Sequence, residues 1–276
     1  MKYHLVDALG GEEDVYFLLL RAFQISCVIV VGGELVFGSP YGSQSTYKGA
    51  LALNGRLTWV LMELVSPVAL LYSYYAMDSF VPVARSKSHS LVSIAFCALW
   101  IMHYVNRALV YPLRQTSRKP MHIGIGLTSC LFNTLNGYLN GRWFSVFSNG
   151  IYNEDYLNTH TLQVVFGLCL FVLGMVGNIY HDNILMGLRR PATGKPNNRY
   201  SVPVGGLFAM VSCPHYFCEV VEWTGYAILT QSPAAWTFAL ATLCNLLPRA
   251  YSIHKWYQRE FPKYPANRKA MIPYII

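Results

Sequence analysis

Seven apolar stretches, each close to the length needed to cross a bilayer, account for most of the 276 residues. A membrane-spanning helix needs about 20 mainly apolar residues, and this template matches residues near 15–37, 57–77, 91–113, 121–141, 162–185, 206–230 and 234–251. Charged residues make up 12% of the chain and hydrophobic residues 54%, which is too apolar for an ordinary soluble domain. The sequence therefore predicts an all-α integral membrane protein of seven transmembrane helices, folded as a single domain over residues 1–276.

Lysine and arginine are distributed unevenly between the loops. The loops 38–56, 114–120 and 186–204 and the tail from Ser252 hold 14 of them, whereas the alternate set of loops holds three. Short loops rich in these residues stay in the cytosol. We therefore expect the N-terminus outside or in the lumen and the C-terminus in the cytosol, in the endoplasmic reticulum membrane or a bacterial inner membrane. This charge either contacts anionic headgroups or binds a clustered anionic ligand.

Three ionisable residues, His215, Glu219 and Glu222, interrupt the apolar stretch 206–230. An ionisable side chain at membrane depth costs at least about 2.5–3.5 kcal/mol, so it needs a partner, water or a bound polar ligand. Spacings of four and then three residues place all three on one helical face. This face is predicted to line a polar cavity.

Other polar residues lie at compatible depths in the predicted bundle. Glu63, Tyr104, Arg107 and Asn178 fall about 9–13 Å from the cytosolic ends of their helices, at 1.5 Å per residue. Each one alone is explained by an interhelical hydrogen bond. Together they favour a shared cavity open to the cytosol.

The segment GMVGNIYHDNILMGLRRP combines an amide, a carboxylate and paired guanidiniums. Asn178 and Asp182 are four residues apart and share a face, from which His181 and Asn183 are turned away. Carboxylates accept hydrogen bonds from sugar hydroxyls and arginine forks bind phosphate, so this order suits a nucleotide. The chain has no GxGxxG or GxxxxGK[ST] motif, so a nucleotide would be held without Rossmann or P-loop machinery.

The C-terminal half resembles the steroid 5α-reductase family of NADPH-using membrane enzymes. The resemblance lies in GMVGNIYHDNILMGLRRP, RYSVPVGGLFAMVSCPHYFCEVVEWTGYA and KYPANRKAMIPYII, and earlier in LTWVLMELVSP and IMHYVNRALVYPL. It covers roughly residues 55–276 and is nearest to the steroid-reducing branch. It implies reduction of a carbon–carbon double bond conjugated to a ketone, as in a 3-oxo-4-ene steroid, with hydride delivered from NADPH.

The resemblance also implies the roles of individual residues. Glu63 and Tyr104 would polarise the ketone oxygen as it gains negative charge, and stabilising that charge should contribute more to the rate than any other effect. Their similar depths agree with this pairing, and low dielectric favours the neutral, donating form of a carboxyl group. The positions implied for the cofactor are Arg107, Tyr111, Arg118, Asn178, Asp182, Arg189, Tyr200, His215, Glu219, Trp223, Arg249 and Tyr257.

Three residues depart from the family pattern. His215 stands where many relatives have asparagine, Ser201 where arginine is common, and Ile253 where histidine occurs. An imidazole can still donate a hydrogen bond to a carboxamide, but it titrates near neutrality. These departures bear on phosphate binding and on the choice of NADPH over NADH, and leave the reaction type unchanged.

Four alternatives agree less well with the sequence. Related membrane reductases act on enoyl-CoA or polyprenal substrates, and Glu63 argues against them. An isoprenylcysteine-type methyltransferase would need an Arg-His pair where Ser212 and Cys213 stand. A seven-helix receptor is disfavoured because it needs no arginine-rich cytosolic surface aligned with an intramembrane Asn/Asp face, and a transporter because internal repeats are missing. A metal site on His215, Glu219 and Glu222 lacks a second helix with ligands, so we expect no metal.

Overall fold

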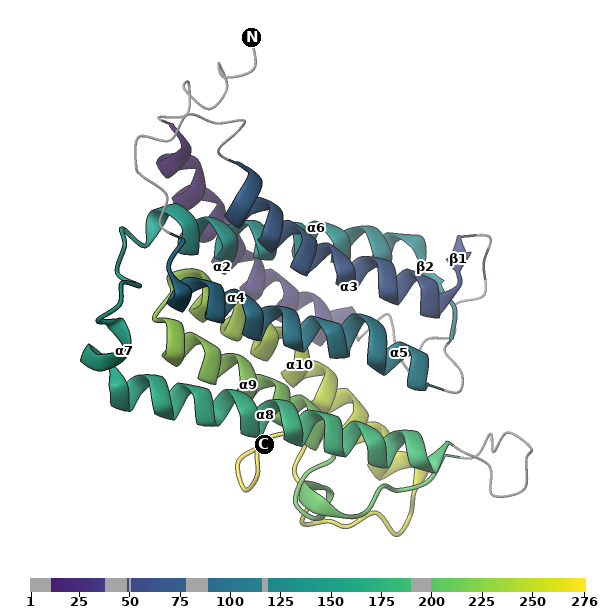
Figure 1. Cartoon of the computed structure of the whole chain (residues 1–276). Helices are drawn as coiled ribbons and strands as arrows, with labels where there is room; N and C mark the ends of the chain where they lie inside the picture. The colour runs from purple at the N-terminus through teal and green to yellow at the C-terminus, as the bar shows by residue number, and fades with distance from the viewer. Residues whose placement is uncertain (1–10, 38–48, 50, 78–88, 116–118, 190–199) are drawn as a thin grey trace.

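The computed structural model describes residues 11–37, 49, 51–77, 89–115, 119–189 and 200–276, which form a helical protein with one two-stranded β element (Figure 1). Its long helices are α2 (Glu12–Phe37), α3 (Gly55–Leu71), α4 (Leu91–Tyr104), α6 (Ile123–Arg142), α8 (Thr161–Leu188), α9 (Pro214–Thr230) and α10 (Pro233–Glu260). Shorter elements are α5 (Tyr111–Arg114), α7 (Tyr156–Thr159) and the 3₁₀ turn η5 (Gly206–Ala209). Strand β1 (Ala52–Leu53) pairs antiparallel with β2 (Met121–His122), with Ala52 opposite His122.

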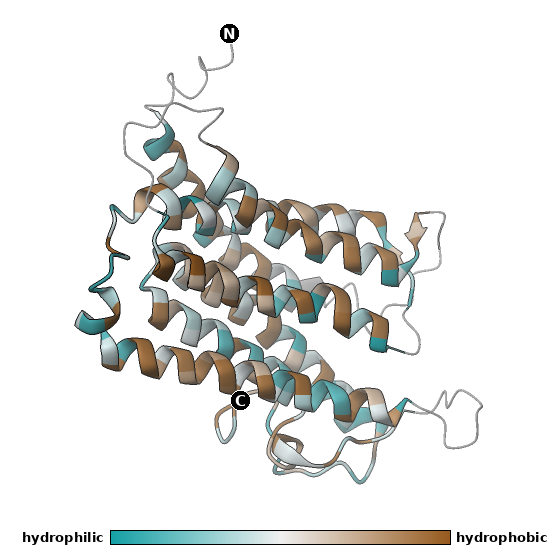
Figure 2. Ribbon diagram, viewed as in Figure 1, coloured by the Kyte–Doolittle hydropathy of each residue, from teal (hydrophilic) through white to brown (hydrophobic). Residues whose placement is uncertain are grey.

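Within the described residues, four helical stretches are long and apolar enough to cross a membrane: Glu12–Glu34, Gly55–Ala76, Leu91–Arg114 and Thr161–Leu188. Their outer faces expose large apolar side chains, including Val28 at 73% and Leu162 at 87% (Figure 2). Exposed apolar faces of this kind are stable in lipid and costly in water. An all-α, multi-pass membrane protein is the architecture that fits.

The predicted segment 206–230 was wrong at its start. The helix α9 begins at Pro214, and Gly206–Ala209 form a separate 3₁₀ turn. Gly205 and Gly206 have φ of 99° and 52°, a conformation that glycine adopts without strain. Proline at the first helical turn sacrifices no intrahelical hydrogen bond, so the chain turns before Pro214 and is helical after it.

Helix α10 is also longer than the predicted segment, since it continues from residue 251 to Glu260. The added turns carry Trp256 and Tyr257, and Tyr257 stacks on Tyr264 of the tail with ring centroids 5.3 Å apart and planes inclined by 10°. Packing against the returning tail keeps these turns helical after the apolar run has ended.

Glycines bring α8 and α9 into close contact. A Cβ on Gly167 would lie 2.6 Å from the backbone nitrogen of Leu229, and one on Gly174 would lie 2.6 Å from the Cα of Glu222. Gly137 of α6 meets α3 in the same way, 2.6 Å from the carbonyl oxygen of Ser66. Small residues at such crossings let membrane helices approach backbone to backbone.

Three long helices continue into π-helical turns, which the sequence did not predict. These are η1 (Tyr72–Ala76) after α3, η3 (Val105–Val110) after α4 and η4 (Trp143–Phe147) after α6. Such turns are rare and occur often at functional sites. The turn η3 begins directly after Tyr104 and contains Arg107.

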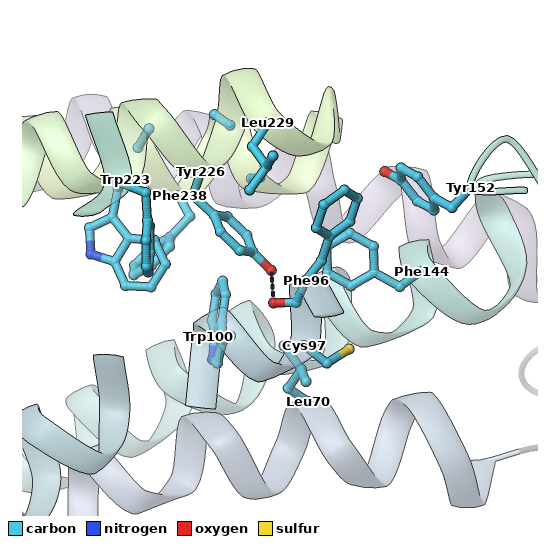
Figure 3. Packing of buried hydrophobic residues seen from close by; sticks show 14 of the residues in the cluster. Leu70, Phe96, Cys97, Trp100, Phe144, Tyr152, Trp223, Tyr226, Leu229 and Phe238 are labelled. Carbon is cyan, nitrogen blue, oxygen red and sulfur yellow. Dashed lines mark hydrogen bonds between the residues drawn. The ribbon is translucent and has the colours of Figure 1, made fainter. Parts of the chain in front are cut away.

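An aromatic cluster fills the interior between α4, α9 and α10 (Figure 3). The fully buried Trp100 lies 5.0 Å from Trp223 and 5.1 Å from Phe238, ring centroid to centroid. The hydroxyl of Tyr226 donates a hydrogen bond of 3.0 Å to the carbonyl oxygen of Phe96. These contacts belong to a packed apolar cluster that also contains Tyr104.

Candidate active site

Arg107 lies between two carboxylates that come from different helices. Its Nε is 4.0 Å from Oε1 of Glu63 on α3, and its Nη2 is 3.7 Å from Oε2 of Glu219 on α9. The side chains of Arg107, Glu63 and Glu219 are 16%, 12% and 10% exposed. Charged side chains this far from water are stable only when they are paired. The two ion pairs of Arg107 therefore connect α3, η3 and α9.

Aromatic side chains hold the guanidinium of Arg107 in place. Its Cζ lies 4.9 Å from the ring centroid of Trp59 and 5.5 Å from that of Tyr111. The indole nitrogen of Trp59 donates a hydrogen bond of 3.1 Å to the Arg107 carbonyl oxygen. These cation–π contacts put Tyr111 beside Arg107.

Tyr104 is 3% exposed and stacks on Trp100, with ring centroids 5.6 Å apart. Ser66 of α3 lies beside its hydroxyl, and the indole nitrogen of Trp100 donates to the Ser66 Oγ at 3.3 Å. Glu63 and Arg107 lie within electrostatic range of the same hydroxyl. The two residues predicted to polarise a ketone therefore meet in one region, across α3 and α4.

Helix α8 joins this group through Asn178. Its Nδ2 donates to the carbonyl oxygen of His215 at 3.0 Å and approaches Oε2 of Glu219 at 3.4 Å. Asp182, one turn later, is 6% exposed and lies within electrostatic range of Arg107. The face predicted for Asn178 and Asp182 thus points at the same polar region.

His181 points away from that face but has a structural role. Its Nδ1 donates to the carbonyl oxygen of Gly177 at 2.6 Å, and its Nε2 accepts from the backbone N–H of Leu207 at 3.0 Å. The side chain thereby fixes the 3₁₀ turn η5 against α8. Asn183 is exposed.

Two buried polar atoms of α9 have no hydrogen-bond partner in the part of the chain that the structure describes. They are Nδ1 of His215 and Nε1 of Trp223. Leaving such a group unpaired costs about 1–3 kcal/mol, so each of the two atoms suits a bound polar ligand. The predicted cofactor positions therefore include groups that a polar ligand such as a carboxamide suits.

Arg249 and Tyr257 both lie on α10, and Arg249 is within electrostatic range of His215. Nη2 of Arg249 lies 3.5 Å from Oε1 of Glu34, and Tyr216 lies within reach of the same guanidinium. Tyr257 is 8% exposed. Glu34 did not appear among the predicted residues, although a carboxylate at the end of an apolar stretch could have indicated it.

Two predicted cofactor residues, Arg189 and Tyr200, are exposed. Arg189 is exposed at the end of α8, within electrostatic range of His215 and Tyr257. Tyr200 is 47% exposed and packs edge-on against Trp256 at 5.0 Å. Arg118 falls outside the described residues. The exposed pair, Arg189 and Tyr200, belongs to the predicted basic loop 186–204.

His103 was not among the residues predicted from the sequence. Its Nδ1 lies 2.7 Å from Oε1 of Glu222, and both residues are buried. The signal available was a histidine next to Tyr104 in an apolar stretch. Glu219 and Glu222 thus have separate partners, and the described residues contain no group of three His, Cys, Asp or Glu arranged for a metal ion.

Comparison with known proteins identifies the family. The model of the family described as 3-oxo-5-alpha-steroid 4-dehydrogenase matches residues 119–276. The chain belongs to this family. It is 37% identical to 3-oxo-5-alpha-steroid 4-dehydrogenase 1 of Bos taurus over 99% of this chain and 97% of that protein. Its identity to steroid 5-alpha-reductase DET2 of Solanum lycopersicum is 36%, over 95% of each chain.

A third relative, from Schizosaccharomyces pombe, is 36% identical over 95% of this chain and 98% of its own length, and its name states no activity. The predicted resemblance to the steroid 5α-reductases is confirmed. As a member of this family the protein is an oxidoreductase, and its apolar helices fit a multi-pass membrane protein.

Proposed function

We propose that the protein reduces the 4,5 double bond of 3-oxo-4-ene steroids with NADPH. One hydride is added to C5, one proton to C4, and NADP⁺ leaves, so that NADPH and one proton are consumed for each steroid reduced. The observation that carries the proposal is the meeting of Glu63, Arg107 and Glu219 beside Tyr104, deep in a bundle of apolar helices.

NADPH supplies the hydride when bound. The contribution of the chain is to stabilise the negative charge that develops on the 3-ketone oxygen. The Tyr104 hydroxyl donates a hydrogen bond to that oxygen, and Glu63 orients the hydroxyl from the neighbouring helix. A donor held rigidly in a dry site needs no reorganisation as the charge develops, and stacking on Trp100 holds Tyr104 in this way.

Arg107 controls the charge around this donor. With Glu63 and Glu219 on either side, its guanidinium keeps two carboxylates close together without net repulsion. Glu219 also accepts a hydrogen bond from Asn178. The charged residues around Arg107 are therefore connected to a residue proposed to bind the nucleotide. This arrangement links the steroid end of the site to the cofactor end.

The unpaired Nδ1 of His215 and Nε1 of Trp223 suit the polar groups of a nicotinamide. Asn178 and Asp182 suit a ribose, and the arginines suit the phosphates. The full proposed set is Arg107, Tyr111, Arg118, Asn178, Asp182, Arg189, Tyr200, His215, Glu219, Trp223, Arg249 and Tyr257. His215 in place of asparagine keeps a donor for the carboxamide.

The proposed layout is a single domain of seven spanning helices, with the N-terminus outside or in the lumen and the C-terminus in the cytosol. It is supported by the four apolar helices and by the excess of lysine and arginine in one set of loops. The membrane is the endoplasmic reticulum or a bacterial inner membrane. The steroid then enters from lipid and the cofactor from the cytosol.

The test is a labelled turnover assay with the purified protein. NADPH carrying deuterium at the transferred position should give a product with one deuterium at C5 and one solvent hydrogen at C4, detected by mass analysis. Enoyl-CoA and polyprenal substrates are assayed in parallel. Reduction of one of these, with the steroid left unchanged, would assign the protein to another reductase branch.

A further inference from the structure

The buried pair formed by His103 and Glu222 has no part in the chemistry proposed above. Glu222 is 1% exposed and His103 is 5% exposed, with 2.7 Å between Nδ1 and Oε1. Burying such a pair gives little net stability, because desolvation of both groups offsets their attraction. Its presence next to Tyr104 therefore calls for a reason other than stability.

Each partner is attached to a different part of the site. His103 packs edge-on against Tyr104, its neighbour on α4, with ring centroids 5.1 Å apart. It also packs against Trp223 of α9 at 4.5 Å. One imidazole thus contacts both the proposed ketone-polarising residue and a proposed nicotinamide-side residue.

The backbone of Glu222 packs directly against helix α8. A Cβ on Gly174 would lie 2.6 Å from the Cα of Glu222, so α8 lies directly against α9 at this residue. The Glu222 carboxylate therefore projects from two closely packed helices, α8 and α9. Its hydrogen-bond partner on α4 is His103. Figure 1 shows α4 between α3 and this unit.

We propose that the His103–Glu222 pair is a positioning device, which sets the placement of α4 relative to α9 and so the distance from Tyr104 to the cofactor face of α9. This inference rests on the proposed function. A misplacement of about 1 Å can cost about 100-fold in rate, and a charged hydrogen bond across two helices holds distance and angle more tightly than apolar contacts do. Glu219 and Arg107 are the other charged groups facing the pair.

The test compares Glu222→Gln with Tyr226→Phe in the full-length enzyme. Both substitutions affect a buried hydrogen bond between α9 and α4, since Tyr226 donates to the carbonyl oxygen of Phe96. We expect Glu222→Gln to lower kcat about 10-fold or more, with KM for NADPH changed less than about 3-fold. Tyr226→Phe should keep kcat within about 3-fold of the wild type.

A double variant, His103→Phe with Glu222→Leu, separates positioning from stability. Because the double variant leaves no buried charge unpaired, its thermal unfolding temperature should be close to that of the wild type. Its kcat should stay low. Recovery of kcat together with stability would overturn the proposal, as would equal losses in Glu222→Gln and Tyr226→Phe. A wild type that reduces no enone would instead reject the proposed function, and the positioning role with it.

Discussion

At the scale of single residues, the Tyr104 hydroxyl has unusual surroundings for a buried phenol. Ser66 lies beside it, and Glu63 and Arg107 lie within electrostatic range. A buried tyrosine with only a structural role needs one acceptor. Two charged side chains arranged around the hydroxyl suit a donor that serves a substrate whose charge changes during the reaction.

We predict that Tyr104→Phe and Glu63→Gln each lower turnover by about 100-fold or more, the scale of losing one donor to a developing oxyanion. Affinity for NADPH should be nearly unchanged, because neither side chain is proposed to hold the nucleotide. Steady-state kinetics and cofactor titration by fluorescence measure both quantities. Tyr75→Phe, at an exposed tyrosine, is the control, and full activity in Tyr104→Phe would reject the assignment.

Several members of this site were predictable from the sequence. Glu63, Arg107, Asn178 and Glu219 are polar residues in apolar stretches, and the cost of burying them indicates a shared site. His103 was not predictable as part of it, because a lone buried histidine is explained equally well by a local contact. Its role follows from Glu222, which lies 119 residues away in the sequence and meets it only in the folded bundle.

At the scale of helices, glycine positions decide how closely α8 and α9 pack. Gly174→Ala should destabilise the protein by about 1–3 kcal/mol, because the added methyl group would overlap the backbone at Glu222. Gly187→Ala on the same helix is the matched control, since a Cβ added there would meet no atom within 4 Å. Its stability should change by less than about 0.5 kcal/mol. Thermal unfolding in detergent compares the two, and equal effects would contradict close packing at Gly174.

The apolar pattern of the sequence predicted where the long helices lie, but it did not always predict the residues at which they begin and end. Because residues 206–213 are mostly apolar, hydropathy predicted that the helix begins at residue 206. The backbone instead turns at Gly206, and the helix begins at Pro214. The π-helical turn η3 has no sequence signal, because it depends on how neighbouring helices pack. Arg107 projects from this turn, so the detailed geometry of the site could not be derived from the sequence.

The tail after α10 is attached by a hydrogen-bond network at Ser212. Its Oγ lies 2.6 Å from Nδ1 of His254 and 2.6 Å from the hydroxyl of Tyr264. The amide nitrogen of Gln258 lies 2.9 Å from Nε2 of His254. Since an amide N–H can only donate, Nε2 must accept and Nδ1 must carry the proton, which requires a neutral imidazole.

Burial, together with the nearby Lys255 and Lys269, lowers the pKa of His254 below its ordinary value of 6.5. The unfolded chain then binds more protons than the folded one below about pH 6.5, so stability is complete above that pH and is lost as the pH falls toward the folded pKa. We predict a lower unfolding temperature at about pH 5.5 than at about pH 7.5, with a smaller difference in His254→Gln. His122→Asn, which keeps a capping side chain before α6, is the control. An equal pH dependence in His254→Gln and the wild type would contradict this role.

At the scale of the whole molecule, the site joins elements from both halves of the chain. Glu63 and Arg107 come from α3 and η3, whereas Asn178 and Glu219 come from α8 and α9. A dinucleotide bound among them would connect these elements, and a ligand that binds only the folded state stabilises it by mass action. The effect on unfolding should therefore be global.

We predict that NADPH at about 100 times its Kd raises the free energy of unfolding by about 2.7 kcal/mol, seen as a higher unfolding temperature in detergent. NADH should give a smaller shift because it lacks the 2′-phosphate that the arginines are proposed to bind, and S-adenosylmethionine should give none. Arg189→Ala should reduce the difference between NADPH and NADH, because one proposed phosphate ligand is lost. A shift with S-adenosylmethionine alone would favour a methyltransferase, and no shift with any of the three would remove the nucleotide site on which the proposed reduction depends.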